Sequence, residues 1–181
     1  MKSNHGGVCL FYKECYAVRT SKLPMCKTME VLGVHVHSAA TNLLIIMVYR
    51  SGSVAVNTLF FDEFTDLIER VAAFAAPIVI VGDINLHLDD PSASKTASFN
   101  DILRDADLTQ HVIGATHRAG YTLDVLITQS DAIVSVTVDQ SGAISDHSLI
   151  IANIVPGLTI LSASDTVIRR QWVKFNEVKF R

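Results

Sequence analysis

Apolar positions in the first 50 residues follow the pattern of β-strands. Hydrophobic side chains gather in residues 8–12 and 14–20, on either side of Lys13, which predicts a hairpin with its turn near that lysine. Two more apolar runs, residues 29–37 and 43–49, are separated by a polar segment and predict two further strands. The first part of the chain is therefore expected to form a sheet.

The period of the apolar pattern changes after Asn57. Hydrophobic side chains then recur at intervals of three and four residues, which predicts a helix with one buried face and with Asn57 capping its first turn. This stripe consists of Phe60, Phe64, Leu67, Ile68, Val71, Phe74 and Ala75. Pro77 is expected to end the helix, and the apolar residues 78–81 predict a short strand directly after it.

A second helix is predicted over residues 94–105, and its buried positions are Phe99, Ile102 and Leu103. Three further apolar segments predict strands at residues 122–128, 133–138 and 149–154. Strands, two helices between them and then more strands indicate a mixed α/β, or α+β, layered domain. We expect this domain to span residues 1–155, followed by a linker and basic tail at residues 156–181.

The composition indicates a globular protein, because 49% of the residues are hydrophobic and 18% are charged. The longest strongly apolar run, residues 43–49, is too short to cross a bilayer, and residues 1–7 contain no apolar signal region. The sequence therefore predicts an intracellular protein, nuclear or cytoplasmic, with no membrane partner. Cys9, Cys15 and Cys26 are odd in number and lack metal-ligand spacing, so they are expected to be free thiols.

Charge is unevenly distributed along the chain, whose net charge is −3. Residues 1–30 hold five basic side chains against two acidic ones, and residues 166–181 hold five against one. The stretch between them holds the remaining five basic and fifteen acidic side chains, a balance of −10. Since nucleic-acid binders usually present a basic patch, charge alone does not point to DNA, and only the two ends would supply such a patch.

Four short polar clusters each follow or flank a predicted strand. They are Tyr49-Arg50, Gly82-Asp83-Ile84-Asn85, Thr116-His117 with Leu123-Asp124, and Ser145-Asp146-His147. Taken singly, each cluster is weak evidence for an active site. Gly-Asp after a strand is often only a turn, and Ser-Asp-His can equally be a capped loop. Together they place carboxylates, amides and a histidine at strand ends, where active sites of α/β proteins usually lie.

These residue types suit the hydrolysis of a phosphodiester. The reaction needs an activated water, an in-line geometry and neutralisation of charge on the phosphate oxygens. A carboxylate can accept the proton of the water, an amide can orient it, and a histidine can polarise a phosphate oxygen. A second carboxylate can hold the histidine tautomer, and a third can bind magnesium, which prefers oxygen ligands. Asp83, Asn85, His147, Asp124 and Asp146 supply this set.

The order of the motifs YR, GDxN, TH…LD and SDH resembles the endonuclease/exonuclease/phosphatase superfamily. Residues 81–89, 110–112 and 115–128 are more specifically similar to the apurinic-type endonuclease domains of LINE-class, non-LTR retrotransposons. The resemblance runs from about Gly6 to Ile154. It implies a two-layer β-sandwich flanked by helices and a magnesium cofactor.

The resemblance also implies a role for each motif residue. Asp83 would activate or position the attacking water, and Asn85 would orient it against the phosphate. His147 would bind and polarise the phosphate, with Asp124 holding its ring. The resemblance places four residues on the substrate side: Tyr49, Arg50, Thr116 and Ser145. Tyr49 would contact the phosphate. Thr116 would support the site, and Ser145 would steady the last loop. Asp146 would be the carboxylate on the metal side.

The sequence departs from this family at two points. Family members begin with a strand ending in Asn and a segment carrying a metal-binding Glu, whereas residues 5–8 already resemble the strand that follows that Glu. The early acids Glu14 and Glu30 do not stand in that context, and Ser51 replaces the usual proline after Tyr-Arg. We therefore expect an N-terminally truncated domain that lacks the first strand and helix, binds magnesium weakly and has impaired activity.

Three functions remain open from the sequence. The first is a magnesium-dependent endonuclease that nicks DNA to prime a reverse transcriptase in the parent polyprotein. The second is a catalytically inactive remnant or binding module, which the absent Glu favours for this chain. The third is another phosphatase of the superfamily. An unpaired sheet edge also predicts self-association.

The remaining histidines are expected to have structural roles. His35 and His37 alternate on one predicted strand and are expected on a solvated sheet face. His87 and His111 match the sequence of the family rather than its chemistry. His117 lies beside Thr116 and could approach the substrate, although a structural role is the simpler expectation.

Overall fold

The computed structural model describes residues 7–39, 42–74, 76–140 and 145–155. These residues form eight strands and two helices in mixed order. In chain order they are β1 (Ala17–Ser21), β2 (Glu30–His37), β3 (Asn42–Tyr49), α1 (Thr58–Val71), β4 (Ile78–Asp83), α2 (Ser94–Asp105), β5 (Leu108–Gln110), β6 (Asp124–Gln129), β7 (Ile133–Asp139) and β8 (Leu149–Val155).

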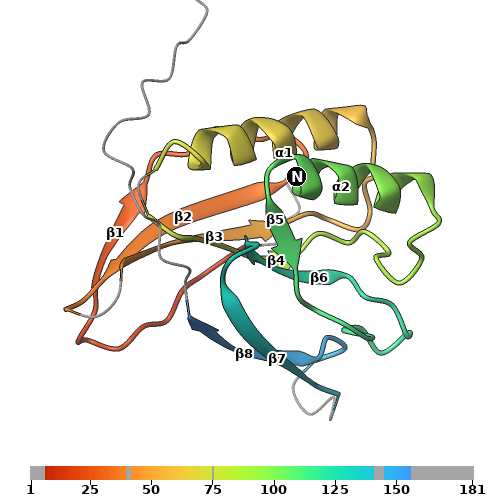
Figure 1. Cartoon of the computed structure of the whole chain (residues 1–181). Helices are drawn as coiled ribbons and strands as arrows, with labels where there is room; N and C mark the ends of the chain where they lie inside the picture. Colours follow the sequence, from red (N-terminus) through yellow and green to blue (C-terminus); the bar gives the residue numbers. More distant parts are fainter. Residues whose placement is uncertain (1–6, 40–41, 75, 141–144, 156–181) are drawn as a thin grey trace, which may run out of the picture.

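Six strands form one mixed sheet in the order β1-β2-β3-β4-β6-β5, and β7 and β8 form a separate antiparallel pair. Strands β3 and β4 are parallel, so the chain must cross over between them, and α1 makes that crossover. Figure 1 shows α1 and α2 on one side of the large sheet and the β7–β8 hairpin on the other. The carboxyl ends of β3 and β4 therefore lie together at one edge.

The main hydrophobic core fills the space between the helices and the large sheet. Phe60, Phe64 and Phe99 are almost fully buried there, and the rings of Phe64 and Phe99 lie 5.1 Å apart. The first turn of α1 is capped as its sequence indicates, since the Asn57 side chain accepts a hydrogen bond from the Phe60 backbone N–H at 3.1 Å. This layer packs β3 and β4 against the helices.

The opposite face of the sheet carries a smaller cluster. Val34, Val36 and Met47 are buried on it, and Val8 and Leu10 pack against them from a segment without regular structure. The sequence prediction of a strand at residues 8–12 was wrong. A strand requires a hydrogen-bonded neighbour, and within the described part of the chain this segment has none.

Most of the predicted elements are confirmed. The second helix has the predicted bounds, and the strands after it were placed to within two residues. Helix α1 ends at Val71, before Pro77, and the three-residue strand β5 was not predicted. Neither helix is both long and apolar enough to cross a membrane. All three cysteines are free thiols, and the predicted tail at residues 156–181 lies outside the described residues.

Candidate active site

Four polar side chains form one row across the large sheet. The strand pairing places Tyr49 beside Asp83, and Asp83 beside Asp124. On the other side of Tyr49 its partner is Glu30, which is exposed. Because paired residues of adjacent strands direct their side chains to the same face of a sheet, this row presents three carboxylates around the end of β4.

The turn after β4 is built around a close contact between two backbones. Gly82 has a φ of +139°, and a Cβ atom at this position would lie 1.9 Å from the Val48 carbonyl oxygen. Only glycine therefore lets β4 approach β3 here. This close approach sets the position of Asp83 at the edge of the sheet.

Asp83 and Asn85 bind each other across this turn. The Asn85 backbone N–H donates to Asp83 Oδ1 at 2.9 Å, and Asn85 Nδ2 donates to Asp83 Oδ2 at 2.8 Å. Asn85 Nδ2 also donates to the Arg50 carbonyl at 2.8 Å. Both amide hydrogens of Asn85 are thus used, which leaves its Oδ1 as the group that can accept from a water or substrate.

Arg50 lies beneath this turn with a relative exposure of 3%. Its guanidinium donates to the backbone carbonyls of Ile84 at 2.6 Å and Asn85 at 2.5 Å, and also to those of Ser51 and Val54. These contacts use the donors that a substrate phosphate would need. The geometry favours a role for Arg50 in holding the 83–85 turn.

His147 approaches the row of carboxylates from the loop before β8. Its Nδ1 lies 2.8 Å from Asp124 Oδ2, which is hydrogen-bond distance. Asp124 is itself held by Thr116, a fully buried residue whose Oγ1 accepts from the backbone N–H groups of Leu123 at 2.9 Å and Asp124 at 3.2 Å. The Ser145 Oγ accepts from the His147 N–H at 2.9 Å and so braces the loop.

The free nitrogen of His147, Nε2, faces Asp83 Oδ2 at 3.9 Å. Burial lowers the pKa of His147, but the hydrogen bond to Asp124 and the charges of Asp124, Asp83 and Asp146 outweigh it and raise the pKa above its ordinary value. Burial also raises the pKa of Asp83, helped by the charge of Asp124 and opposed by the hydrogen bonds from Asn85. His147 therefore favours its cationic form more than an ordinary imidazole does, and Asp83 ionises less readily than an ordinary carboxyl group.

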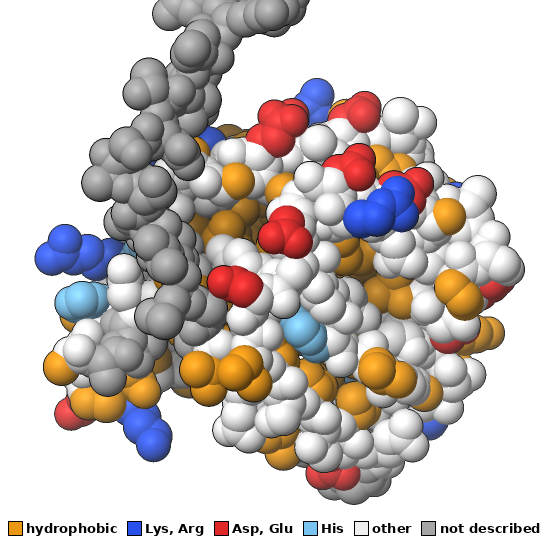
Figure 2. Space-filling view, in the orientation of Figure 1, with side chains coloured by type: hydrophobic (Ala, Val, Ile, Leu, Met, Phe, Trp, Pro, Cys, Tyr) orange, Lys and Arg blue, Asp and Glu red, His pale blue; other side chains and the backbone are white. Residues whose placement is uncertain are grey.

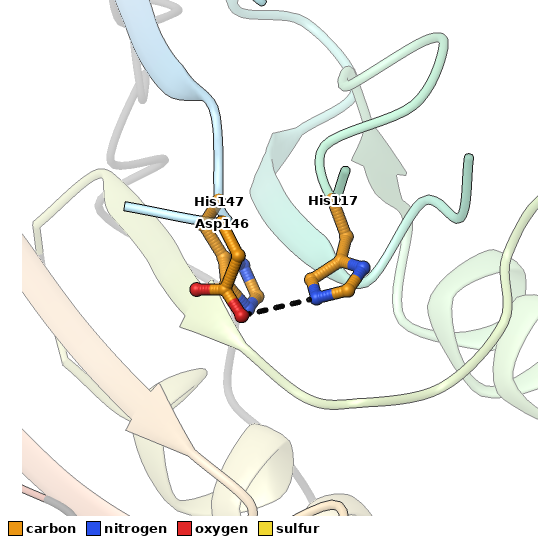
Figure 3. A group of neighbouring side chains, drawn as sticks. All are labelled: His117, Asp146 and His147. Carbon is orange, nitrogen blue, oxygen red and sulfur yellow. Dashed lines mark ion pairs between the residues drawn. The ribbon is translucent and has the colours of Figure 1, made fainter. Parts of the chain in front are cut away.

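Asp146 lies on the solvent side of His147 and contacts a second histidine. His117 Nε2 is 3.4 Å from Asp146 Oδ2, and the Asp146 side chain is 62% exposed. The dashed line in Figure 3 marks this ion pair. Ligand atoms of His117, Asp146 and His147 all lie within 4.8 Å of one another. A cavity of about 440 Å³ opens beside them and is also lined by Arg118 and Gln140.

The structure thus brings Asp83, Asn85, Asp124 and His147 together, with Thr116 and Ser145 directly behind them. Tyr49 is half-buried and lies next to Asp83 in the sheet. Sequence reasoning did not assign His117 to the site, although the Thr-His pair was noted. Glu30 was set aside because it does not stand in the sequence context of the family's metal-binding Glu, and the strand register places it in the row.

The fold is similar to that of solved structures that include a retrotransposon endonuclease domain and an endonuclease/exonuclease/phosphatase family protein. No family model and no curated protein matches the sequence. The endonuclease domain of TRAS1, a telomere-specific non-LTR retrotransposon, matches the structure with a TM-score of 0.60 at 14% identity, over 78% of this chain and 67% of that domain.

Two further solved structures share the fold. An endonuclease/exonuclease/phosphatase family protein from Leptotrichia buccalis matches with a TM-score of 0.54 at 11% identity, over 80% of this chain and 73% of that one. The 3′ phosphatase NExo from Neisseria, bound to a product DNA hairpin, matches with a TM-score of 0.52 at 16% identity, over 78% and 80%. At these identities the likeness establishes the fold, and the function has to be argued from the site.

Proposed function

We propose that this chain is an endonuclease domain of the retrotransposon type, which hydrolyses phosphodiester bonds of DNA. The observation that carries this proposal is the pair of Asp83 and His147, which face each other across 3.9 Å. That separation is too long for a direct hydrogen bond and leaves both groups able to contact a phosphate oxygen or a water. The fold shared with the TRAS1 endonuclease domain supports the same reading.

In this proposal Asp83 accepts the proton of the attacking water. Its raised pKa makes it a stronger base than an ordinary carboxylate. Asn85 Oδ1 orients the water by accepting its other hydrogen. The water is thereby directed at the phosphorus atom from the side of β4.

His147 binds the phosphate in the same proposal. Because its Nδ1 donates to Asp124, its Nε2 can donate to a phosphate oxygen only in the imidazolium form. The raised pKa favours that form. The cation both donates a hydrogen bond and offsets negative charge that develops on the phosphate oxygens.

The donor chemistry at Asp146 fits magnesium. That ion keeps several of its waters in proteins and takes one or two carboxylates together with substrate phosphates, and the Asp146 carboxylate is exposed enough to leave room for them. When bound, the ion would neutralise charge on the phosphate oxygens. Because Asp146 is the carboxylate that the described residues offer on the solvent side of His147, we expect weak binding and slow nicking.

The surface favours one side of the molecule for DNA. Figure 2 shows acidic side chains over the helices at the top of the view, and α1 alone contributes Asp62, Glu63, Asp66 and Glu69. DNA is therefore expected at the strand ends and not on the helix layer. In a parent polyprotein, the nick would prime a reverse transcriptase.

Plasmid nicking tests the proposal. Supercoiled DNA is incubated with magnesium and wild-type protein, Asp83→Ala or His147→Ala, and each substitution should reduce the rate by ~10²–10⁴. Asp101→Ala, which removes a solvent-exposed carboxylate on α2, is the matched control and should leave the rate unchanged. Nicking that survives both site substitutions would refute the proposal.

A second substrate separates the alternatives. Release of phosphate from a duplex with a 3′-phosphate is measured in parallel. Phosphate release without nicking, lost in Asp83→Ala, would make the chain a phosphatase of DNA ends. A folded domain without either activity would favour the inactive remnant or binding module.

A further inference from the structure

His117 and His147 are neighbours with opposite hydrogen-bonding patterns. Their rings lie 5.0 Å apart at 76°, and their backbones form an antiparallel bridge. The Arg118 N–H donates to the Asp146 carbonyl at 2.8 Å and the Ser148 N–H donates to the Thr116 carbonyl at 2.7 Å. The loop that carries His117 is thus fixed directly against the loop that carries Asp146 and His147.

The backbone also sets which nitrogen of His117 bears the proton. The Ala119 N–H donates to His117 Nδ1 at 3.1 Å, so Nδ1 must be an acceptor and the neutral ring carries its hydrogen on Nε2. That nitrogen is the one that faces Asp146 Oδ2 at 3.4 Å. His147 has the reverse arrangement, because its Nδ1 faces the carboxylate of Asp124.

This difference argues against a metal ion held by both histidines. A metal ligand must offer a lone pair, so His117 Nε2 would have to lose its hydrogen. The neutral ring could then carry that hydrogen only on Nδ1. Nδ1 is not available for it, because it already accepts from the Ala119 N–H. The contact between His117 and Asp146 is therefore better described as a donor–acceptor pair beside His147 than as part of a metal-ligand set. His117 is its donor and Asp146 its acceptor.

We propose that His117 is a positioning residue of the nuclease site, which holds the exposed carboxylate of Asp146 beside His147 through its Nε2 hydrogen. The inference rests on the proposed function for its catalytic consequence, but not for its geometry. An exposed aspartate loses side-chain freedom only if something fixes it, and His117 provides that contact on a backbone already bridged to the same loop. Small displacements of such groups cost catalysis steeply.

Two substitutions separate this donor role from simple ring packing. His117→Gln keeps a neutral N–H donor at about the position of Nε2, whereas His117→Phe keeps a ring against His147 and has no donor. We expect plasmid nicking by His117→Phe to fall by about tenfold to a hundredfold in kcat with little change in KM. His117→Gln should stay within about threefold of wild type. Equal losses in both variants, or no loss in either, would overturn the proposal, provided that thermal unfolding shows both variants folded.

A spectroscopic measurement tests the geometry without an activity assay. Nitrogen-15 NMR of the labelled histidines should show neutral His117 with its proton on Nε2 and neutral His147 with its proton on Nδ1. The His117 Nε2 proton should exchange with water faster in Asp146→Asn than in wild type. Neutral His117 with its proton on Nδ1, or exchange unaffected by Asp146→Asn, would refute the positioning role even in an active enzyme. If neither wild type nor variants nick DNA while these NMR results hold, the proposed function fails and the contact stands.

Discussion

Asp124 Oδ2 lies 2.8 Å from His147 Nδ1, although the two residues are 23 positions apart in the sequence. Asp124 begins β6, where Thr116 holds its backbone, and His147 lies in the loop before β8. Their contact fixes the ring so that Nε2 faces Asp83, and together with the charges of Asp83 and Asp146 it outweighs the effect of burial on the pKa of His147. Two separate parts of the fold are thus needed to direct one nitrogen towards Asp83.

Replacing Asp124 by asparagine should uncouple this pair. The Asp124→Asn substitution would keep the shape of the side chain but remove its charge, so the pKa of His147 should fall towards or below the ordinary value of about 6.5. Nicking at neutral pH should drop by at least about tenfold, because less imidazolium is present and the ring is held less firmly. An NMR titration of His147 measures the first effect and plasmid nicking the second.

Asp101→Asn is the control for Asp124→Asn, since Asp101 pairs with Arg104 on the exposed surface of α2. It should leave both the His147 titration and the nicking rate unchanged. A pKa of His147 that rises in Asp124→Asn would contradict the assigned hydrogen bond.

The raised pKa of His147 predicts how its contribution to stability changes with pH. A histidine whose pKa is higher in the folded than in the unfolded state stabilises the fold fully below the unfolded value, about 6.5, and loses this contribution as pH rises through the folded value. The free energy of unfolding of wild type minus that of His147→Gln should therefore be largest near pH 5 and decrease as the pH rises. Urea unfolding of both proteins at several pH values measures this difference.

The same series with His37→Gln provides the comparison, because His37 is an exposed histidine at the end of β2. It reports the effect of removing a histidine at the opposite end of β2 from Glu30, away from the row of carboxylates. A difference for His147→Gln that grows with rising pH would show that Asp124 and Asp83 do not stabilise the cation.

Short-range signals in the sequence were sufficient for much of the fold. The spacing of Phe60, Phe64 and Leu67 and the cap at Asn57 are local, and α2 could be bounded in the same way. Strand β5 could not be found, because three residues carry no periodic pattern and become a strand only by pairing with β6. The segment at residues 8–12 has a strand-like composition but no partner in the described structure.

The motif residues of the candidate site could be named from the sequence, whereas their neighbours could not. Strand ends and motif order indicated Asp83, Asp124 and His147. The sequence could not reveal that Arg50 is buried under the 83–85 turn, because burial of a charged side chain depends on four carbonyls brought there by the fold. The place of Glu30 depends on the register of β2 against β3, which is set by contacts distant in sequence.

Gly82→Ala should destabilise the domain strongly. The new Cβ would lie 1.9 Å from the Val48 carbonyl oxygen, and neither strand can move without breaking the sheet. We expect a loss of more than about 3 kcal/mol in the free energy of unfolding. Gly120→Ala is the matched control, because Gly120 also has a positive φ, +91°, but open space around its Cβ position, so it should cost only about 1 kcal/mol. Thermal unfolding of both variants measures the two losses of stability. Equal losses would mean that the strain of a positive φ, and not the close approach to Val48, destabilises Gly82→Ala.

Arg50→Lys should reduce stability and activity together. A lysine cannot donate to four carbonyls from one planar group, so the carbonyls of Ile84 and Asn85 would lose partners at a buried site. Each unsatisfied carbonyl costs about 1–3 kcal/mol. Urea unfolding and nicking kinetics test this together. A variant of wild-type stability with only a higher KM for DNA would assign Arg50 to substrate contact instead.

The β7–β8 hairpin presents an apolar surface to solvent. Ile133, Leu149, Ile151 and Val155 alternate along its two strands on one face and are 51% to 72% exposed. Within the described residues these two strands form a sheet of their own, so each also has an unpaired edge. Exposed apolar patches and free strand edges both promote association, and here they coincide.

We therefore predict that the isolated chain self-associates through β7–β8, and that Ile151→Lys weakens this association by placing a charge in the centre of the patch. Light scattering at several protein concentrations should show a smaller average mass for Ile151→Lys than for wild type, and binding of a hydrophobic dye should fall with it. Ile113→Lys is the control, since Ile113 is 89% exposed in a loop outside the hairpin and its substitution adds the same charge. Equal effects of both substitutions would attribute any change to net charge, and a wild-type protein that stays monomeric at all concentrations would show that this surface does not drive association.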